Sequence, residues 1–166
     1  MDDAPLILEW MNDPETTRYL GYGFLKKRSL GDVESEIALR LDGEFTGERL
    51  SIEDADTGKY IGECGLIAPD ERAMASEVSI VIVKGARGRG YGRAALKALM
   101  QKAFTELGYQ KLYLKCAGGN APAVRLYEAL GFKKEGVLRR HILVDGALED
   151  VIIYAMLREE YLPNLL

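Results

Sequence analysis

The sequence predicts an α/β (α+β) fold, a single domain over residues 1–166 built on one mixed β-sheet, and three observations support it. Turn residues at 56–59 join two alternating segments into an antiparallel hairpin on the N-terminal side. Asp145 and Gly146 join a second hairpin at the C-terminal end. Between the hairpins, a strand, a helix and a strand form a βαβ unit, which requires two parallel strands and a right-handed crossover.

Caps, breakers and periodicity give the order of the elements. The first 45 residues should be mainly helical, with N-caps at Asp2 or Asp3 and at Ser29. Gly108 and Gly131 should end the two later helices. We therefore expect helices over residues 2–10, after 12–14, and over 29–41, 93–107 and 120–130, and strands over 48–54, 59–68, 75–83, 111–116, 132–141 and 147–157.

Composition and charge restrict the class of partner. The chain has a formal charge of −4, with 48% apolar and 29% charged residues, which is ordinary for a globular domain in water. A nucleic-acid partner is not expected because it needs a basic face, whereas a cationic partner such as an amine fits. No apolar run approaches the roughly 20 residues that span a bilayer, and no positive region precedes the first apolar stretch. We therefore expect a cytoplasmic protein without a membrane partner.

The two cysteines and the single histidine give little support for metal or thiol chemistry. Cys64 and Cys116 lie in apolar strand-like segments rather than in a CxxC pair, so we expect buried, reduced thiols. His141 is the only histidine, so a histidine-rich metal site is not supported and no metal is expected.

A loop rich in glycine and arginine is the sharpest feature of the sequence. Between a buried strand and a helix it comprises Arg87, Gly88, Arg89, Gly90, Tyr91, Gly92 and Arg93. Glycines let the backbone approach an anion, and free N–H groups at a helix N-terminus attract a pyrophosphate. The alternative is a solvated basic turn. A Walker loop would need Lys-Ser or Lys-Thr after the glycines, and a dinucleotide fold would need GxGxxG with an acidic residue ending the next strand, and the sequence has neither.

The spacing Arg87-x-x-Gly90-x-Gly92 resembles the pyrophosphate motif of the GNAT superfamily of acyl-coenzyme A dependent N-acetyltransferases. Independently, NAPAVRLYEALGFKKEG at residues 120–136 is similar to the superfamily's second motif, a helix that carries an Asn and a Tyr and ends in Gly-Phe. The segment LRRHILVDGALEDVIIYAMLREEY resembles the branch of ribosomal-protein N-terminal and spermidine acetyltransferases. In that branch a strand usually precedes the first helix, whereas in this chain the helix is expected at Asp2.

The resemblance implies acetyl-CoA as co-substrate and assigns roles to residues around it. The backbone of Ile80, Val81 and Ile82 should pair with pantetheine where the parallel strands splay apart, and a backbone N–H there can hold an oxyanion. Asn120 and Tyr127 are seven positions apart and therefore lie on nearly one helix face, about 10 Å apart along the axis. The family assigns Asn120 to the pantetheine amides and Tyr127 to protonation of the leaving thiolate. Without the resemblance, residues 80–83 are more simply a buried parallel strand, and the spacing favours a core aromatic at Tyr127.

Candidates for the acceptor side come from strand alternation. Glu77 should share one face with Ser79 and Val81, so its carboxylate is either a base for an ammonium or an exposed strand carboxylate. His141 is either an acceptor-pocket residue or a half-buried strand histidine. A polyamine could be attracted by carboxylates that otherwise form a solvated helix face, namely Glu34, Glu36, Asp42 and Glu44.

These residues lead to three hypotheses. The first is an N-acetyltransferase that moves acetyl from acetyl-CoA to a primary amine by direct attack in a ternary complex. The second is a non-catalytic acyl-CoA binding module, which would need the loop and the strand but neither Tyr127 nor Glu77. The third passes the acetyl group through a thioester on Cys64 or Cys116. The acceptor can be a protein N-terminus, a polyamine or another small amine, and a homo-oligomer is left open.

Overall fold

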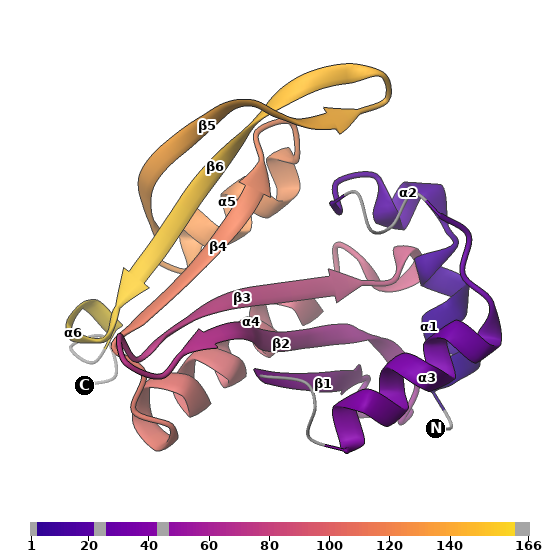
Figure 1. Cartoon of the computed structure of the whole chain (residues 1–166). Coiled ribbons are helices and arrows are strands. Elements are labelled where there is room, and N and C mark those ends of the chain that lie inside the picture. The colour runs from indigo at the N-terminus through magenta and orange to yellow at the C-terminus, as the bar shows by residue number, and fades with distance from the viewer. Residues whose placement is uncertain (1–2, 22–25, 43–46, 162–166) are drawn as a thin grey trace.

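The computed structural model describes residues 3–21, 26–42 and 47–161 (Figure 1). One six-stranded sheet has the spatial order β1-β2-β3-β4-β6-β5. Neighbouring strands pair antiparallel except β3 and β4, which are parallel, and this confirms the predicted mixed sheet. The strands are β1 (Gly47–Glu53), β2 (Tyr60–Asp70), β3 (Ala75–Ile82), β4 (Lys111–Ala117), β5 (Lys133–Val144) and β6 (Ala147–Leu157).

The helices cover the sheet in two groups. Figure 1 shows α4 and α5 behind the sheet, and α1 and α3 at the end of β2 and β3. None of the described helices is both long and apolar enough to cross a membrane. The helices are α1 (Ala4–Met11), α2 (Pro14–Thr17), α3 (Leu30–Leu41), α4 (Tyr91–Gln101), α5 (Ala121–Ala129) and α6 (Arg158–Tyr161), with a 3-10 turn at Lys84–Ala86 and a π-helical turn at Lys102–Glu106.

The helix caps follow the sequence in two places and depart from it in one. Ser29 forms the expected capping box with Asp32 at the start of α3, and Asn120 caps α5 by accepting from the Ala123 N–H. Asp3 holds the N-cap position of α1, but its side chain makes no cap hydrogen bond. Its carboxylate instead accepts from the Ser51 hydroxyl at 2.7 Å. The predicted side-chain cap at Asp3 is therefore wrong, because the Asp3 carboxylate binds Ser51 on β1 and not the N-terminus of α1. Asp2 lies outside the described residues.

The main hydrophobic core lies between the sheet and the helices α4 and α5. Leu96, Leu99 and Phe104 are at most 2% exposed, and they belong to one cluster with strand residues such as Leu66 and Leu112. A fully buried leucine or phenylalanine side chain contributes about 1.5–3 kcal/mol to folding. This packing fixes α4, and with it the glycine loop at its N-terminus, against the sheet.

A second apolar cluster joins α1 and α3 to the opposite face of the sheet. Trp10 and Tyr60 are buried in it, and the Trp10 indole N–H donates to the Tyr60 hydroxyl at 2.9 Å. Val81 packs against this cluster whereas Ile80 packs against the main core, as strand alternation requires. The two faces of β3 therefore meet different groups of helices.

The parallel strands β3 and β4 separate after a short region of pairing. Residues 75–77 pair with residues 111–113, and Figure 1 shows the two strands diverging beyond that point. Because β3 stays paired with β2 up to Ile82 and β4 with β6 up to Ala117, the sheet divides into two halves. The facing edges of residues 78–82 and 114–117 are called the β3–β4 fork below. The fork confirms the predicted splay of the parallel strands.

Candidate active site

The glycine loop exposes its backbone directly before α4. Gly88 and Gly90 have φ values of +75° and +86°, in the left-handed region that glycine adopts without strain. A Cβ at either position would meet no atom within 4 Å apart from its chain neighbours. The Ala94 N–H donates to the Gly90 carbonyl at 3.1 Å in the first turn, so the N–H groups of residues 91–93 have no acceptor within the helix. Open space in front of free N–H groups fits a pyrophosphate.

The three arginines of the loop differ in their surroundings. Arg87 donates from Nε to the Ile82 carbonyl at 3.0 Å and from its terminal nitrogen to the Thr16 hydroxyl at 2.9 Å. Arg89 and Arg93 are exposed. Through these hydrogen bonds, Arg87 holds the loop against β3 and α2. The side chains of Arg89 and Arg93 are free to face a phosphate group.

Tyr91 connects the loop to the β1–β2 hairpin. Its hydroxyl donates to the Asp54 carboxylate, which also accepts from the Thr57 hydroxyl at 2.9 Å. The hydrogen bond from Tyr91, followed by that from Thr57, lowers the pKa of Asp54, and the same bond raises the pKa of Tyr91. The Arg89 guanidinium lies 5.0 Å from the centre of the Tyr91 ring. The side chain of Tyr91 thus positions the loop and Arg89, a role that the motif alone did not indicate.

The backbone of β3 offers alternate residues to the fork. The Val83 N–H donates to the Ile61 carbonyl of β2 at 3.0 Å. Because successive residues of a strand turn their backbone groups to opposite edges, Val81 also faces β2, whereas Ile80 and Ile82 face the fork. The predicted pairing of Val81 with pantetheine is not favoured by this register, because the Val81 backbone groups face β2. Arg87 already binds the Ile82 carbonyl, so Ile80 has the most accessible pairing groups.

Tyr127 lies on the inner face of α5, in contact with the main core. It is 9% exposed, and its ring lies 6.0 Å from that of Phe132 and 6.3 Å from that of Tyr154. Burial raises the pKa of Tyr127 above its usual range, so the phenol keeps its proton at neutral pH. Its hydroxyl makes no hydrogen bond within the part of the chain that the structure describes. Tyr127 is therefore both a core aromatic and an available proton donor.

Asn120 stands at the start of the same helix. Its side-chain oxygen accepts from the Ala123 N–H at 3.3 Å, which fixes the amide group at the N-terminus of α5. The cap uses the acceptor atom, so the side-chain NH2 group remains available as a hydrogen-bond donor. Asn120 and Tyr127 remain on one helix as the sequence predicts.

Glu77 lies at the apex of the fork, on the face opposite Tyr127. It is the last β3 residue that pairs with β4, through Tyr113. Its carboxylate binds the Lys115 ammonium at 3.0 Å, with 18% of the Glu77 side chain exposed. The hydroxyl of Ser79, two residues further along the same face, is buried and has no hydrogen-bond partner among the described residues. Alternation indicated that Ser79 accompanies Glu77, but no sequence signal gives the register that adds Lys115.

The segment around α2 bridges the two halves of the sheet, which the sequence did not reveal. On one side it contacts the glycine loop and its preceding turn, and on the other it contacts the β5–β6 turn and the loop before α5. Figure 1 shows α2 between these regions. The contacts are Glu15–Lys84 at 2.6 Å, Thr16–Arg87 at 2.9 Å, Arg18–Asp145 at 2.5 Å and Tyr19–Gly119 at 3.2 Å.

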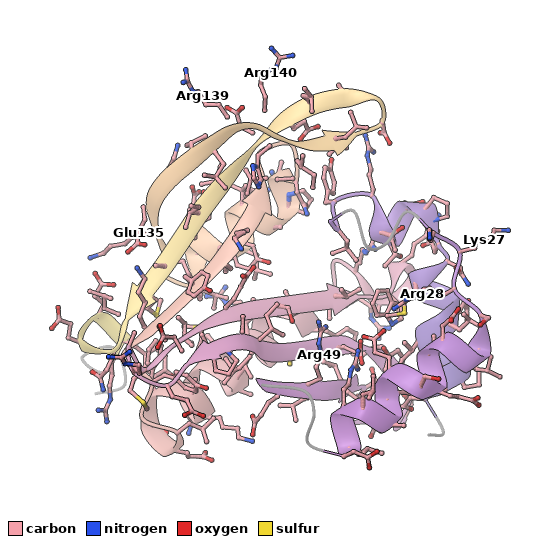
Figure 2. The ribbon with its side chains drawn as sticks, in the orientation of Figure 1. Lys27, Arg28, Arg49, Glu135, Arg139 and Arg140 are labelled. Carbon is pink, nitrogen blue, oxygen red and sulfur yellow. The ribbon has the colours of Figure 1, made fainter. Side chains whose placement is uncertain are left out.

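His141 is not brought to the fork. It is exposed on β5, which β6 and β4 separate from the fork. Residues 139–141 form a bulge, because Leu138 pairs with Val151 and Ile142 with Glu149. The bulge and Asp150 line an open hollow of about 640 Å³, and Figure 2 shows Arg139 and Arg140 pointing away from the sheet. This hollow contains none of the other predicted site residues.

Of the carboxylates predicted to attract a polyamine, one within the described residues, Glu36, is bound by arginines. Glu36 binds Arg28 at 2.7 Å and Arg40 at 2.5 Å, and Arg40 also reaches the buried Glu63 at 3.1 Å. Glu34 and Asp42 are exposed, and Glu44 lies outside the described residues. A polyamine would therefore compete with two guanidinium groups at Glu36.

The cysteines are buried, as predicted. Cys64 is 5% exposed and Cys116 is 4% exposed, and burial raises the pKa of each thiol to about 11. A thiol with such a pKa is almost wholly protonated at neutral pH, and the thiolate is the nucleophile. The described residues contain no cluster of histidine, cysteine and carboxylate side chains that could hold a metal ion.

The chain is similar in sequence to known acetyltransferases. Residues 1–133 match the family described as Acetyltransferase (GNAT) domain. An uncharacterized N-acetyltransferase, p20, from Bacillus licheniformis is 29% identical over 161 residues, which cover 97% of this chain and 90% of the relative. Spermidine N(1)-acetyltransferase from Vibrio cholerae is 33% identical over 114 residues, which cover 69% of this chain and 65% of the relative.

The similarity extends to three dimensions. The crystal structure of spermidine N-acetyltransferase from Vibrio cholerae in complex with CoA and spermine has a TM-score of 0.87 to this chain at 28% identity. The match covers 97% of this chain and 93% of that one, so it includes both halves of the sheet. With a family match over most of its sequence and a shared fold along nearly all of its length, the protein belongs to the GNAT family of acetyl-CoA-dependent N-acetyltransferases.

Proposed function

We propose that the protein transfers acetyl from acetyl-CoA to a primary amine by direct attack in a ternary complex at the β3–β4 fork. The observation that carries this proposal is the placement of Glu77 and Tyr127 on opposite faces of the fork. One face then holds a carboxylate that can take a proton from an amine, and the other holds a buried phenol that can give one to a thiolate. A binding module would need neither group.

The residues of this chain bind and orient acetyl-CoA along one continuous path. The N–H groups of residues 88–93, with Arg89 and Arg93, hold the pyrophosphate. The Ile80 backbone and the Asn120 amide hold the pantetheine arm. When bound, acetyl-CoA supplies an activated acyl group as a thioester. A backbone N–H on the free edge of β3 is placed to stabilise the negative charge that develops on the carbonyl oxygen.

Side chains carry out both proton transfers, one from the attacking amine and one to the leaving thiolate. An alkyl amine has a pKa of about 10, so at pH 7.5 only about one molecule in 300 carries the lone pair needed for attack. Glu77 accepts the ammonium proton directly or through a water. Tyr127 donates its proton to the sulfur as the carbon–sulfur bond breaks.

Glu77→Gln should lose activity at neutral pH and regain it as pH rises. Without the base, only amine that is already neutral can attack, and that fraction grows about tenfold per pH unit below pH 10. The ratio of wild-type to variant kcat/KM should therefore shrink steadily from pH 7 to pH 9.5. Glu135→Gln is the matched control, because Glu135 is also a strand carboxylate bound to a lysine, Lys111, at 2.7 Å. A variant-to-wild-type ratio that stays constant across this range would remove Glu77 from the proton path.

A panel of amines tests the function itself. Peptides with free N-termini, polyamines, aminosugars and aminoglycosides are offered with acetyl-CoA, and both CoA thiol and acetylated product are quantified. Polyamines and protein N-termini come first, since relatives are named as a spermidine N(1)-acetyltransferase and a putative ribosomal N-acetyltransferase. At least one amine should raise thiol release and yield an equal amount of product. Tight CoA binding without amine-dependent release across the panel would instead identify an acyl-CoA binding module.

A further inference from the structure

We infer that Lys115 occupies the position of the acceptor amine, and that the enzyme acetylates the Nζ atom of Lys115 when no acceptor is bound. This inference rests on the proposed function, because it uses the same base, acid and acyl donor. It assigns a modification site to a side chain that neither the motifs nor the family resemblance singled out.

The register of β3 and β4 places Lys115 beside the base. Glu77 and Tyr113 form the last pair of the two strands, and Lys115 follows Tyr113 on the same face of β4. Continued pairing would set Lys115 next to Ser79. Because the strands diverge instead, the Lys115 side chain reaches back across the fork to Glu77, where its Nζ lies 3.0 Å from a carboxylate oxygen. A primary amine of the chain itself therefore contacts the group proposed to deprotonate the substrate.

The surroundings of the Glu77–Lys115 pair allow the lysine amine to move away from the carboxylate. The Lys115 side chain is 48% exposed and that of Glu77 is 18% exposed, so the lysine approaches an enclosed carboxylate from the solvent side. An ion pair with one such exposed partner is weak, and an acceptor ammonium can displace it. The buried hydroxyl of Ser79, which has no partner among the described residues, adds a polar group to the same face. In the free enzyme, the Lys115 ammonium thus occupies the position next to Glu77 that the substrate ammonium takes.

The reaction of Lys115 balances in the same way as the reaction of an external amine. Glu77 takes one proton from the ammonium, and the neutral Nζ attacks the thioester carbonyl. A carbon–nitrogen bond forms, the carbon–sulfur bond breaks, and the thiolate takes the Tyr127 proton to leave as CoA. The nitrogen loses its second proton to solvent, and the Tyr127 phenolate regains a proton from solvent. The product is an acetamide on Lys115 without positive charge. It can no longer pair with Glu77, and its acetyl group fills the acceptor position.

Lys111 provides an internal reference for this chemistry. It lies on the same face of β4 and also binds a carboxylate, that of Glu135, at 2.7 Å. Its side chain is 34% exposed, against 48% for that of Lys115, so both ammonium groups are accessible to solvent. It differs in position, because β3 and β4 are still paired at Lys111. Chemical acetylation by acetyl-CoA should treat the two lysines alike, whereas enzymatic acetylation should select Lys115.

The experiment incubates the full chain with acetyl-CoA in the absence of amine and follows each lysine-containing peptide by mass spectrometry. We expect acetylation of Lys115 at least tenfold faster than that of Lys111. The rate per molecule should not change when the protein is diluted tenfold, because the transfer is intramolecular. Glu77→Gln and Tyr127→Phe should each slow acetylation of Lys115 and leave the slow reaction of Lys111 unchanged. A saturating acceptor from the amine panel should protect Lys115.

Other results would overturn the inference. Equal rates at Lys111 and Lys115, no acetylation of Lys115, or a rate that rises with protein concentration would each exclude intramolecular transfer to Lys115. Amine-dependent thiol release is measured on the same preparation. If external amines are acetylated and Lys115 is not, the self-acetylation is wrong while the proposed function stands. If neither is acetylated, both are wrong.

Discussion

Replacing Tyr127 with phenylalanine should lower kcat about 10²-fold while CoA affinity stays at the wild-type level. The phenol is positioned to protonate a leaving thiolate, an interaction made in the transition state and absent from the complex with bound CoA. Phenylalanine keeps the ring that packs 6.0 Å from Phe132 and 6.3 Å from Tyr154. The fold should therefore survive, and steady-state kinetics with calorimetric CoA binding separate the two effects.

Tyr154→Phe is the matched control for this loss of a hydroxyl. Tyr154 is also a buried tyrosine of the main core, but its hydroxyl donates to Glu128 at 2.9 Å on the outer part of α5. It should keep most of its kcat. Full activity of Tyr127→Phe on the best amine, with kcat independent of solvent viscosity so that chemistry limits the rate, would reduce Tyr127 to a packing residue.

Gly90→Val should weaken CoA binding by more than about 10²-fold. Gly90 has a φ of +86°, and a left-handed conformation costs an L-residue roughly 1–2 kcal/mol, with more for a β-branched side chain. The open space in front of Gly90 would also receive the valine methyl groups, where the pyrophosphate has to approach the backbone. Both effects act on the loop that leads into α4. Calorimetric titration of the folded variant with CoA measures the loss.

Gly108→Val separates backbone strain from loss of the phosphate site. Gly108 follows the π-helical turn at the other end of α4 and has a φ of +76°, so valine is strained there to a similar extent. A Cβ at Gly108 would come no closer than 3.9 Å to Met74. The variant should lose stability in thermal unfolding but keep its CoA affinity. Wild-type affinity in Gly90→Val would place the pyrophosphate elsewhere.

The sequence was sufficient for features that depend on local signals. The glycine loop, the caps at Ser29 and Asn120, and the βαβ unit all follow from residues close together in the chain, and the structure has each of them. For the site, the motifs predict the loop, one helix with Asn120 and Tyr127, and Glu77 near the start of β3, and the roles of these residues stay predictions. Glu77 lies at the apex of the fork because the short parallel pairing of β3 with β4 ends there.

Features that depend on register or on distant partners were not predictable. Val81 was assigned to pantetheine, but its backbone direction follows from the pairing of β3 with β2. Arg87 was counted among the cations that bind phosphate. Its guanidinium group, however, donates a hydrogen bond to Thr16, which lies in a distant part of the chain. His141 was left as either an acceptor-pocket residue or a strand histidine, and a bulge and two intervening strands keep it from the fork. No periodicity in one strand reports how it pairs with the next.

The initial-rate pattern with the best amine of the panel tests direct transfer most directly. Rates of CoA release are measured over a grid of acetyl-CoA and amine concentrations and plotted as double reciprocals. Direct attack in a ternary complex predicts intersecting lines, because both substrates must be bound before the acetyl group moves. Parallel lines, together with an acetylated peptide containing Cys64 or Cys116, would show that the acetyl group passes through the protein. That result would contradict direct transfer with Glu77 as the base and Tyr127 as the acid.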